Sequence, residues 1–241
     1  MIRHGFFIPL LLAIGPMIFC IHCTSNPDIK LAQTKPNSPQ EDSIAHSILK
    51  RAAQFLDSDG ERTAHDYLHR EERQQLQYGD IILRKGYGMV SDFIASYLNE
   101  KYPVTHCAFY FEQNNLPFVL HCISNDSVDG IFTEPLANYI KDSQEGSLVA
   151  IRVKTDSTGI QTYMDRAFEL KNRQIPFDMS FDDSDSTKMY CVEMMRHAFY
   201  PVFKRDILHK KAHHLGIHVT HMDNFFNDSL FTVLFNHFDT K

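Results

Sequence analysis

The chain has 241 residues, enough to bury one sizeable hydrophobic core, so a single folded domain is expected. Its net charge of −6 is spread along the chain, and no basic run is long enough to follow a phosphate backbone. Charge and composition therefore exclude nucleic acid as the expected partner and are typical of an ordinary globular protein.

The first residues have the layout of a secretory signal. Arg3 precedes an apolar stretch over residues 6–21, which Pro9 and Pro16 interrupt. A bilayer span needs about 20 apolar residues, and the two prolines also disfavour the alternative of a buried N-terminal helix. We expect residues 1–23 to be a signal peptide or lipoprotein signal, and the protein to be exported to the periplasm or cell envelope.

Two cysteines close the apolar stretch, where bacterial lipoproteins carry the cysteine that is acylated. Cys23 is favoured over Cys20 as a lipid anchor because it leads directly into polar chain, although Phe19 and His22 stand where such signals usually have a small residue. Residues 24–40 place prolines among Asn, Gln, Ser and Lys, which predicts a disordered linker.

The spacing of apolar residues predicts the elements that follow. A helical extension is expected over residues 41–77, made of an amphipathic helix over 41–55 and a highly charged helix over 61–76. The other expected elements are strands over 81–83, 104–111, 117–124, 148–153 and 231–235, and helices over 89–98, 160–170 and 189–199. Their order indicates an α+β fold, with an antiparallel sheet packed against helices in one domain over residues 41–241.

Two histidines lie in neighbouring apolar strands, whose short connector rich in Asn and Gln predicts a β-hairpin. His106 and His121 are directly opposite if the turn is centred between Gln113 and Asn114. They are diagonal neighbours on the same face if the turn is centred one residue later, and a one-residue bulge would separate them. Two satisfied core histidines are the alternative to a catalytic pair.

Removal of the signal leaves three cysteines, an odd number that leaves at least one thiol without a partner inside the chain. Cys107 and Cys122 lie on the hairpin face opposite the histidines, where they form a disulfide or pack as free thiols. Cys191 begins an expected helix, whose N–H groups and dipole favour the thiolate that acyl transfer needs. Its alternative role is that of a buried apolar residue.

The tail and an acidic loop are weak candidates for metal sites. The tail histidines are His209, His213, His214, His218 and His221. His209 and His213 would share one face of a helix, yet no carboxylate or cysteine completes the ligand set, and a solvated loop is favoured. The acidic run over 182–185 lacks the glycine and the final glutamate of a calcium loop. We expect no metal and no cofactor.

Five short motifs, in this order, resemble the permuted papain-like amidases of the NlpC superfamily, in which the usual chain order of cysteine then histidine is inverted. The motifs are Gly79-Asp80-Ile81-Ile82, Ser91-Asp92-Phe93-Ile94, Thr105-His106-Cys107-Ala108, Pro176-Phe177-Asp178 and Tyr190-Cys191-Val192-Glu193. The resemblance runs from Gly79 to about Tyr200, roughly half of the chain. It implies a papain-like fold.

The resemblance also implies a site. Cys191 is the expected nucleophile, His106 the general base, and His121 the third residue, which orients His106. Many relatives have Glu at that third position, whereas the lecithin–retinol acyltransferase branch has His. Phe177 also replaces a Tyr that is expected before Asp178.

The activity implied is that of a cysteine hydrolase, an amidase or peptidase that cleaves amide or ester bonds of cell-envelope peptides or lipids and acts as a monomer. The alternatives are a non-catalytic papain-like module that binds such a ligand, and an acyltransferase on the same scaffold. The presence of both Cys191 and His106 favours the hydrolase.

Overall fold

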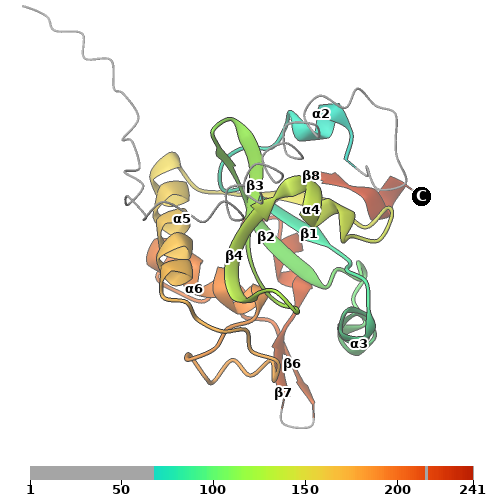
Figure 1. Ribbon diagram of the computed structural model, residues 1–241, viewed down its shortest axis with the longest axis vertical. Helices are drawn as coiled ribbons and strands as arrows, with labels where there is room; N and C mark the ends of the chain where they lie inside the picture. The colour runs from blue at the N-terminus through green and yellow to red at the C-terminus, as the bar shows by residue number, and fades with distance from the viewer. Residues whose placement is uncertain (1–67, 215–216, 241) are drawn as a thin grey trace, which may run out of the picture. The chain divides into compact units, whose positions relative to one another are not determined.

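The computed structural model describes residues 68–214 and 217–240 (Figure 1). The expected signal, the linker and the helix over 41–55 lie outside these residues. The described part of the helix expected over 61–76 contains only the short helix α2 (Arg70–Arg73), which ends before residue 76. None of the helices in the described part of the chain is long and apolar enough to cross a membrane.

Six strands form one antiparallel sheet in the order β4-β3-β2-β1-β5-β8. The strands are β1 (Ile81–Arg84), β2 (His106–Gln113), β3 (Leu116–Ser124), β4 (Asp129–Pro135), β5 (Val149–Val153) and β8 (Phe231–Asn236). Five of them lie where apolar runs predict strands, and the edge strand β4 was not predicted. The expected α+β fold with an antiparallel sheet is confirmed.

Helices cover both faces of this sheet (Figure 1). In addition to α2, the α-helices of the described residues are α3 (Met89–Leu98), α4 (Leu136–Lys141), α5 (Ser157–Asn172) and α6 (Cys191–Phe203). Alternate side chains of β2 point to opposite faces, so Cys107 and Phe109 join the core beneath α5 and α6, whereas Ala108 and Tyr110 join the core beneath α4. The face on which a strand residue lies therefore decides which helix it meets.

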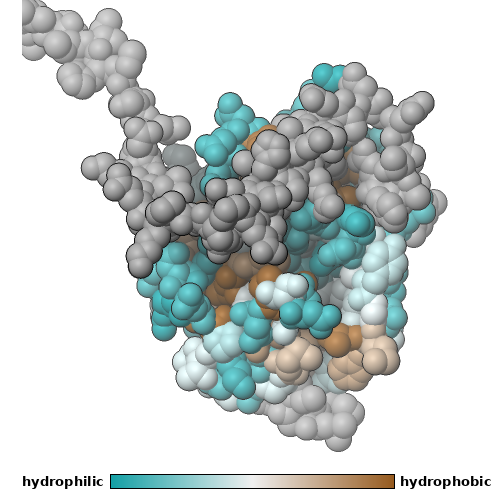
Figure 2. All heavy atoms as spheres, viewed as in Figure 1, coloured by the Kyte–Doolittle hydropathy of each residue, from teal (hydrophilic) through white to brown (hydrophobic). Residues whose placement is uncertain are grey.

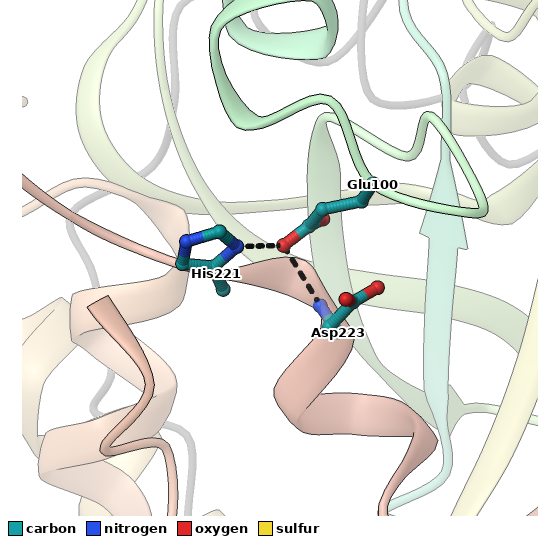
Figure 3. A group of neighbouring side chains, drawn as sticks. All are labelled: Glu100, His221 and Asp223. Carbon is teal, nitrogen blue, oxygen red and sulfur yellow. Dashed lines mark hydrogen bonds and ion pairs between the residues drawn. The ribbon is translucent and has the colours of Figure 1, made fainter. Parts of the chain in front are cut away.

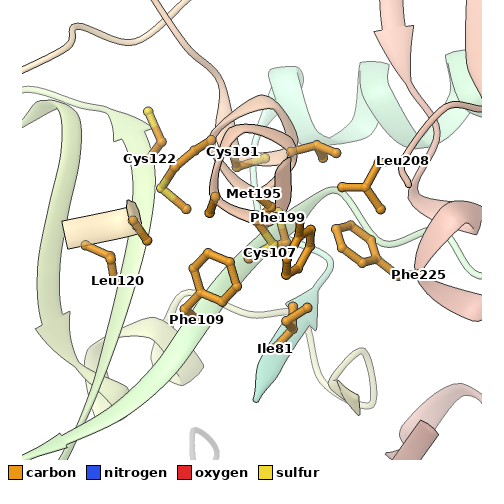
Figure 4. Close-up of a cluster of buried hydrophobic side chains, with 14 of the residues drawn as sticks. Ile81, Cys107, Phe109, Leu120, Cys122, Cys191, Met195, Phe199, Leu208 and Phe225 are labelled. Carbon is orange, nitrogen blue, oxygen red and sulfur yellow. The ribbon is translucent and has the colours of Figure 1, made fainter. Parts of the chain in front are cut away.

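The core beneath α6 is rich in aromatic side chains (Figure 4). Phe199 of α6 packs edge-on against Phe109 of β2, with ring centroids 5.6 Å apart, and against Tyr163 of α5 at 5.3 Å. Aromatic pairs of this geometry add stability beyond the area they bury. They hold α6 against the sheet, which fixes the position of Cys191 at the first residue of the helix.

The β2–β3 turn decides between the possible hairpin registers. Asn114 and Asn115 both have positive φ, 53° and 60°, which is the backbone of the two-residue turn that joins twisted strands. Phe109 pairs with Leu120, so the turn is centred between the two asparagines. The histidines at 106 and 121 are therefore diagonal neighbours on one face, the second of the three arrangements expected.

Two regions differ from their predicted structure. The histidine-rich tail forms a hairpin of β6 (Lys211–His214) and β7 (Ile217–Thr220), followed by the 3-10 helices η1 (Met222–Phe226) and η2 (His237–Thr240). His209 and His213 thus share no helix face, because no helix forms there: His209 precedes β6 and His213 lies in that strand.

Helix α3 also differs from expectation. Met89 and Phe93 are 89% and 55% exposed, and apolar surface lies over this helix in Figure 2. Leu98 is its buried apolar residue, so helical spacing located α3 but not its buried face.

Candidate active site

Cys191 lies at the first position of α6, directly after the N-cap residue Tyr190, which agrees with the expectation that it begins a helix. The pKa of its thiol is lowered by a hydrogen bond from the Cys107 thiol and by the backbone N–H groups of Cys107, Val192 and Cys191 itself, although burial opposes the shift. The first N–H groups of a helix have no partner within the helix, so they are available to stabilise a thiolate.

The thiols of the other two cysteines have raised pKa values instead. Cys107 and Cys122 are free and fully buried, so the disulfide considered for them is absent. Burial raises the pKa of both thiols, and the contact with Cys191 raises that of Cys107 further. The Cys122 thiol donates to the carbonyl oxygen of Met189 at 3.1 Å. Of the three thiols, which Figure 4 shows beside one another, Cys191 is the one suited to nucleophilic attack.

The two histidines are in direct contact. Nε2 of His106 lies 2.7 Å from Nδ1 of His121, a distance typical of a short hydrogen bond between ring nitrogens. The ring of Tyr139 packs against both imidazoles, with centroids 5.7 and 5.3 Å away. His121 is fully buried, whereas His106 keeps some exposed surface. The buried ring therefore holds the more accessible one in place.

A carboxylate that sequence reasoning missed completes this group. Oε1 of Glu134 on β4 lies 3.0 Å from Nε2 of His121, a close polar contact in which an Nε2–H is not well aligned with the oxygen. Glu134 was missed because β4 was not recognised as a strand. The available signal was the apolar pair Ile131-Phe132 directly after Gly130, at the spacing of a short strand.

The surroundings of both imidazoles lower their pKa and so favour the neutral form. Burial, the charge of Arg84 and the neighbouring His121 together keep the pKa of His106 well below its usual value. Burial also lowers the pKa of His121, against the opposing effect of Glu134. Arg84 is itself buried, with its guanidinium over the Tyr139 ring at 4.4 Å from the centroid. A neutral His106 has a free lone pair, which a general base needs.

The start of β2 connects the surroundings of the Cys191 thiol to the two imidazoles. Cys107, which contacts Cys191, is the next residue after His106, and the two side chains point to opposite faces of the sheet. Across residues 68–214 and 217–240 no hydrogen bond joins the Cys191 thiol to an imidazole. The structure thus brings His106 and His121 together and places Cys191 against the backbone beside them.

Comparison with known proteins places the chain in a family. Residues 75–233, more than half of the chain, match the family described as permuted papain-like amidase enzyme, YaeF/YiiX, C92 family. The chain belongs to this family. Among solved structures it is similar to the metalloprotein yiiX from Escherichia coli O157:H7, with 19% sequence identity and a TM-score of 0.53 over 67% of this chain and 98% of that one. This likeness shows a shared fold. No curated protein gives a significant match.

Two of the motifs that carry the resemblance contact each other just before His106. The Ser91 hydroxyl donates to the carbonyl of Gly86 and lies 2.5 Å from the Thr105 hydroxyl, just before His106. Asp80 pairs with Arg152 at 2.8 Å and ties β1 to β5. These contacts give the polar side chains of the motifs partners in a buried region.

The acidic loop before Cys191 forms a polar centre instead of a calcium site. Asp183, which is almost fully buried, accepts hydrogen bonds from Tyr190 at 2.6 Å and Arg196 at 2.8 Å, and pairs with Lys211 at 2.6 Å. The Tyr190 hydroxyl also accepts from the backbone N–H of Thr220 at 3.0 Å. Asp183 therefore joins the N-cap of α6 to the middle of that helix and to the β6–β7 hairpin.

One group of side chains in the described ranges has the composition of a metal site (Figure 3). Glu100 follows α3, and His221 and Asp223 lie at the start of η1. Each already has an internal partner: His221 Nδ1 is 2.5 Å from Glu100 Oε1, the Asp223 N–H donates to the same oxygen, and Lys210 Nζ is 2.7 Å from the Asp223 carboxylate. These contacts account for the group as an ion-pair network that ties α3 to η1.

Proposed function

We propose that the protein is an exported cysteine hydrolase that cleaves amide or ester bonds in cell-envelope peptides or lipids. Cys191 is the nucleophile, His106 the general base and His121 the residue that orients His106. The observation that carries the proposal is the thiol of Cys191 at the start of α6, where the Cys107 thiol and backbone N–H groups lower its pKa. Membership of the permuted papain-like amidase family supports the same activity.

The reaction proceeds by acyl transfer in two steps. In the proposed reaction His106, which makes no hydrogen bond to Cys191 in the described structure, must first approach the thiol; it then takes the thiol proton as the sulfur attacks the carbonyl carbon, and protonates the leaving group. Water, activated by His106, releases the acyl group from the sulfur. The backbone N–H of Cys191 is the candidate for one donor to the developing oxyanion.

Two other functions use the same scaffold. A binding module would hold an envelope peptide or lipid without cleaving it, and an acyltransferase would pass the acyl group to an acceptor other than water. The different pKa shifts of Cys191 and the hairpin thiols favour an enzyme, because a binding module needs no activated thiol. Hydrolysis and transfer are distinguished by the product formed when a competing amine or alcohol is present.

Thiol labelling tests the proposal directly. With iodoacetamide at pH 6 to 9, Cys191 is expected to react first and with a midpoint below the free-thiol value of about 8.5. Cys107 and Cys122 are expected to react slowly, because burial raises their pKa values. Peptide mass spectrometry of a single sample compares the three sites. Equal labelling of all three, with a midpoint near that of a free thiol, would favour the binding module.

Export has its own test. We expect the mature protein from its native host to lack residues up to about 20–23, because a secretory signal is cleaved. An acylated Cys23 or Cys20 would appear as the new N-terminal residue, with the added mass of the lipid. Intact-mass measurement of the envelope fraction gives both results. Full-length, unprocessed chain in the cytosol would contradict export.

A further inference from the structure

Three polar side chains form a line across one face of the sheet. His106, His121 and Glu134 come from the adjacent strands β2, β3 and β4. Val119 pairs with Glu134 and His121 with Phe132, so Glu134 is a diagonal neighbour of His121 on the same face. The contacts of 2.7 and 3.0 Å along this line connect the three groups in series.

The number of hydrogens in this line is restricted. A neutral imidazole carries one N–H, so the short contact between His106 Nε2 and His121 Nδ1 holds one hydrogen. Glu134 is a carboxylate, an acceptor only, and its side chain is 14% exposed while that of His121 is 0% exposed. Placing the His121 hydrogen on Nε2 puts it beside that carboxylate, 3.0 Å away although not aligned as a full hydrogen bond, so the electrostatic attraction favours this position over Nδ1.

The tautomer of His106 follows from that of His121. When Nε2 of His121 carries the hydrogen, its Nδ1 is a bare acceptor, and the shared hydrogen belongs to Nε2 of His106. Nδ1 of His106 is then the bare lone pair. In the opposite tautomer of both rings Nδ1 of His106 would carry a hydrogen, and the ring would have no lone pair on that nitrogen to accept the proton of a thiol.

We propose that Glu134 is a positioning residue that selects the Nε2–H tautomers of His121 and His106 and so leaves Nδ1 of His106 as the base. This rests on the proposed function in one respect, the assignment of His106 as base for Cys191. The carboxylate lies two strands from His106 and acts through the ring of His121.

The same line stabilises the charge that forms during the reaction. When the proton of Cys191 moves to Nδ1 of His106, that ring becomes a cation and donates its Nε2–H to His121. The carboxylate of Glu134, at the other end of the line, is the negative group closest to His121 among its direct contacts. The positive charge of the buried Arg84 lies near both rings and disfavours a cationic His106. The negative charge of Glu134 offsets this repulsion.

Nitrogen NMR of the full chain tests the proposal without any substrate. In protein labelled with ¹⁵N-histidine at pH 7, both rings are expected to show a hydrogen on Nε2 and a bare Nδ1, with assignments from His106→Ala and His121→Ala. In Glu134→Gln and Glu134→Leu a measurable fraction of both rings should change to the Nδ1–H tautomer. Unchanged Nε2–H tautomers in both variants would overturn the proposal.

Two comparisons separate positioning from a merely structural role. Glu145→Gln, at an exposed carboxylate with no ring contact, should leave the tautomers unchanged. With p-nitrophenyl acetate as probe, Glu134→Gln should lower kcat by roughly 10²-fold or more with little change in KM, as expected when a base has the wrong tautomer. Inactive wild-type protein, or active Cys191→Ser, counts against the proposed function alone, because the tautomer measurement is independent of turnover.

Discussion

Cys191→Ser is expected to abolish hydrolysis, lowering kcat/KM for p-nitrophenyl acetate by roughly 10⁴-fold or more, as for other enzymes that lose their nucleophile. The thiol at the start of α6 has a lowered pKa because the Cys107 thiol and backbone N–H groups stabilise the thiolate. A serine hydroxyl is far less acidic, so the same donors leave it protonated. The substitution is nearly isosteric, so the fold should be retained.

The matched control for this variant is Cys122→Ser. Cys122 is also a buried thiol on the face beneath α6, and a serine hydroxyl can replace its hydrogen bond to Met189. This variant should keep activity within a fewfold of wild type, with circular dichroism confirming that both variants fold. Cys191→Ser with activity similar to that of Cys122→Ser would remove Cys191 from the mechanism.

His106→Ala is expected to lower kcat/KM by about 10²- to 10⁴-fold, the range over which a general base contributes. The same substitution should change the pH midpoint for iodoacetamide labelling of Cys191 only slightly. The reason is that the lowered pKa of Cys191 comes from Cys107 and backbone N–H groups, whereas His106 is neutral and supplies no positive charge. A thiolate–imidazolium pair would show the opposite result, a large change in labelling.

The pH dependence of the wild-type enzyme checks the same point. Because the folded pKa of His106 lies below its usual value of about 6.5, the neutral base persists as pH falls through 6.5. The acidic limb of kcat/KM that His106 contributes should therefore lie below pH 6.5. His197→Ala, at a partly exposed imidazole on α6, is the control and should leave the profile unchanged. An acidic limb at or above pH 6.5 would contradict a neutral His106.

Local patterns were sufficient for much of the site. The helical spacing after Cys191 predicted that a helix begins at or just before this residue, and the alternation of β2 and β3 predicted that the histidines face a common side unless a bulge intervenes. Both rest on interactions between residues a few positions apart, which sequence periodicity records directly. The motifs then predicted the papain-like fold that the family match confirms.

Long-range contacts were less accessible. The sequence leaves open whether the hairpin turn is centred before or after Asn114. The choice depends on the backbone conformations of Asn114 and Asn115, and a short connector of this kind can adopt more than one turn conformation. The spacing of the tail histidines is compatible with a helix or with a solvated loop. The pairing of β6 with β7 excludes both for this hairpin. The exposed face of α3 shows the same limit, since periodicity does not say which side meets the protein.

By itself the sequence determined that Cys191 begins a helix and that His106 and His121 lie in paired strands. Only the tertiary structure decided what surrounds them: the Cys107 thiol against Cys191, Arg84 beside both rings, and Glu134 behind His121. These partners come from three separate strands, β2, β1 and β4. The chemistry of each group depends on burial and on charges brought together by packing, and neither quantity is a property of a local stretch of chain.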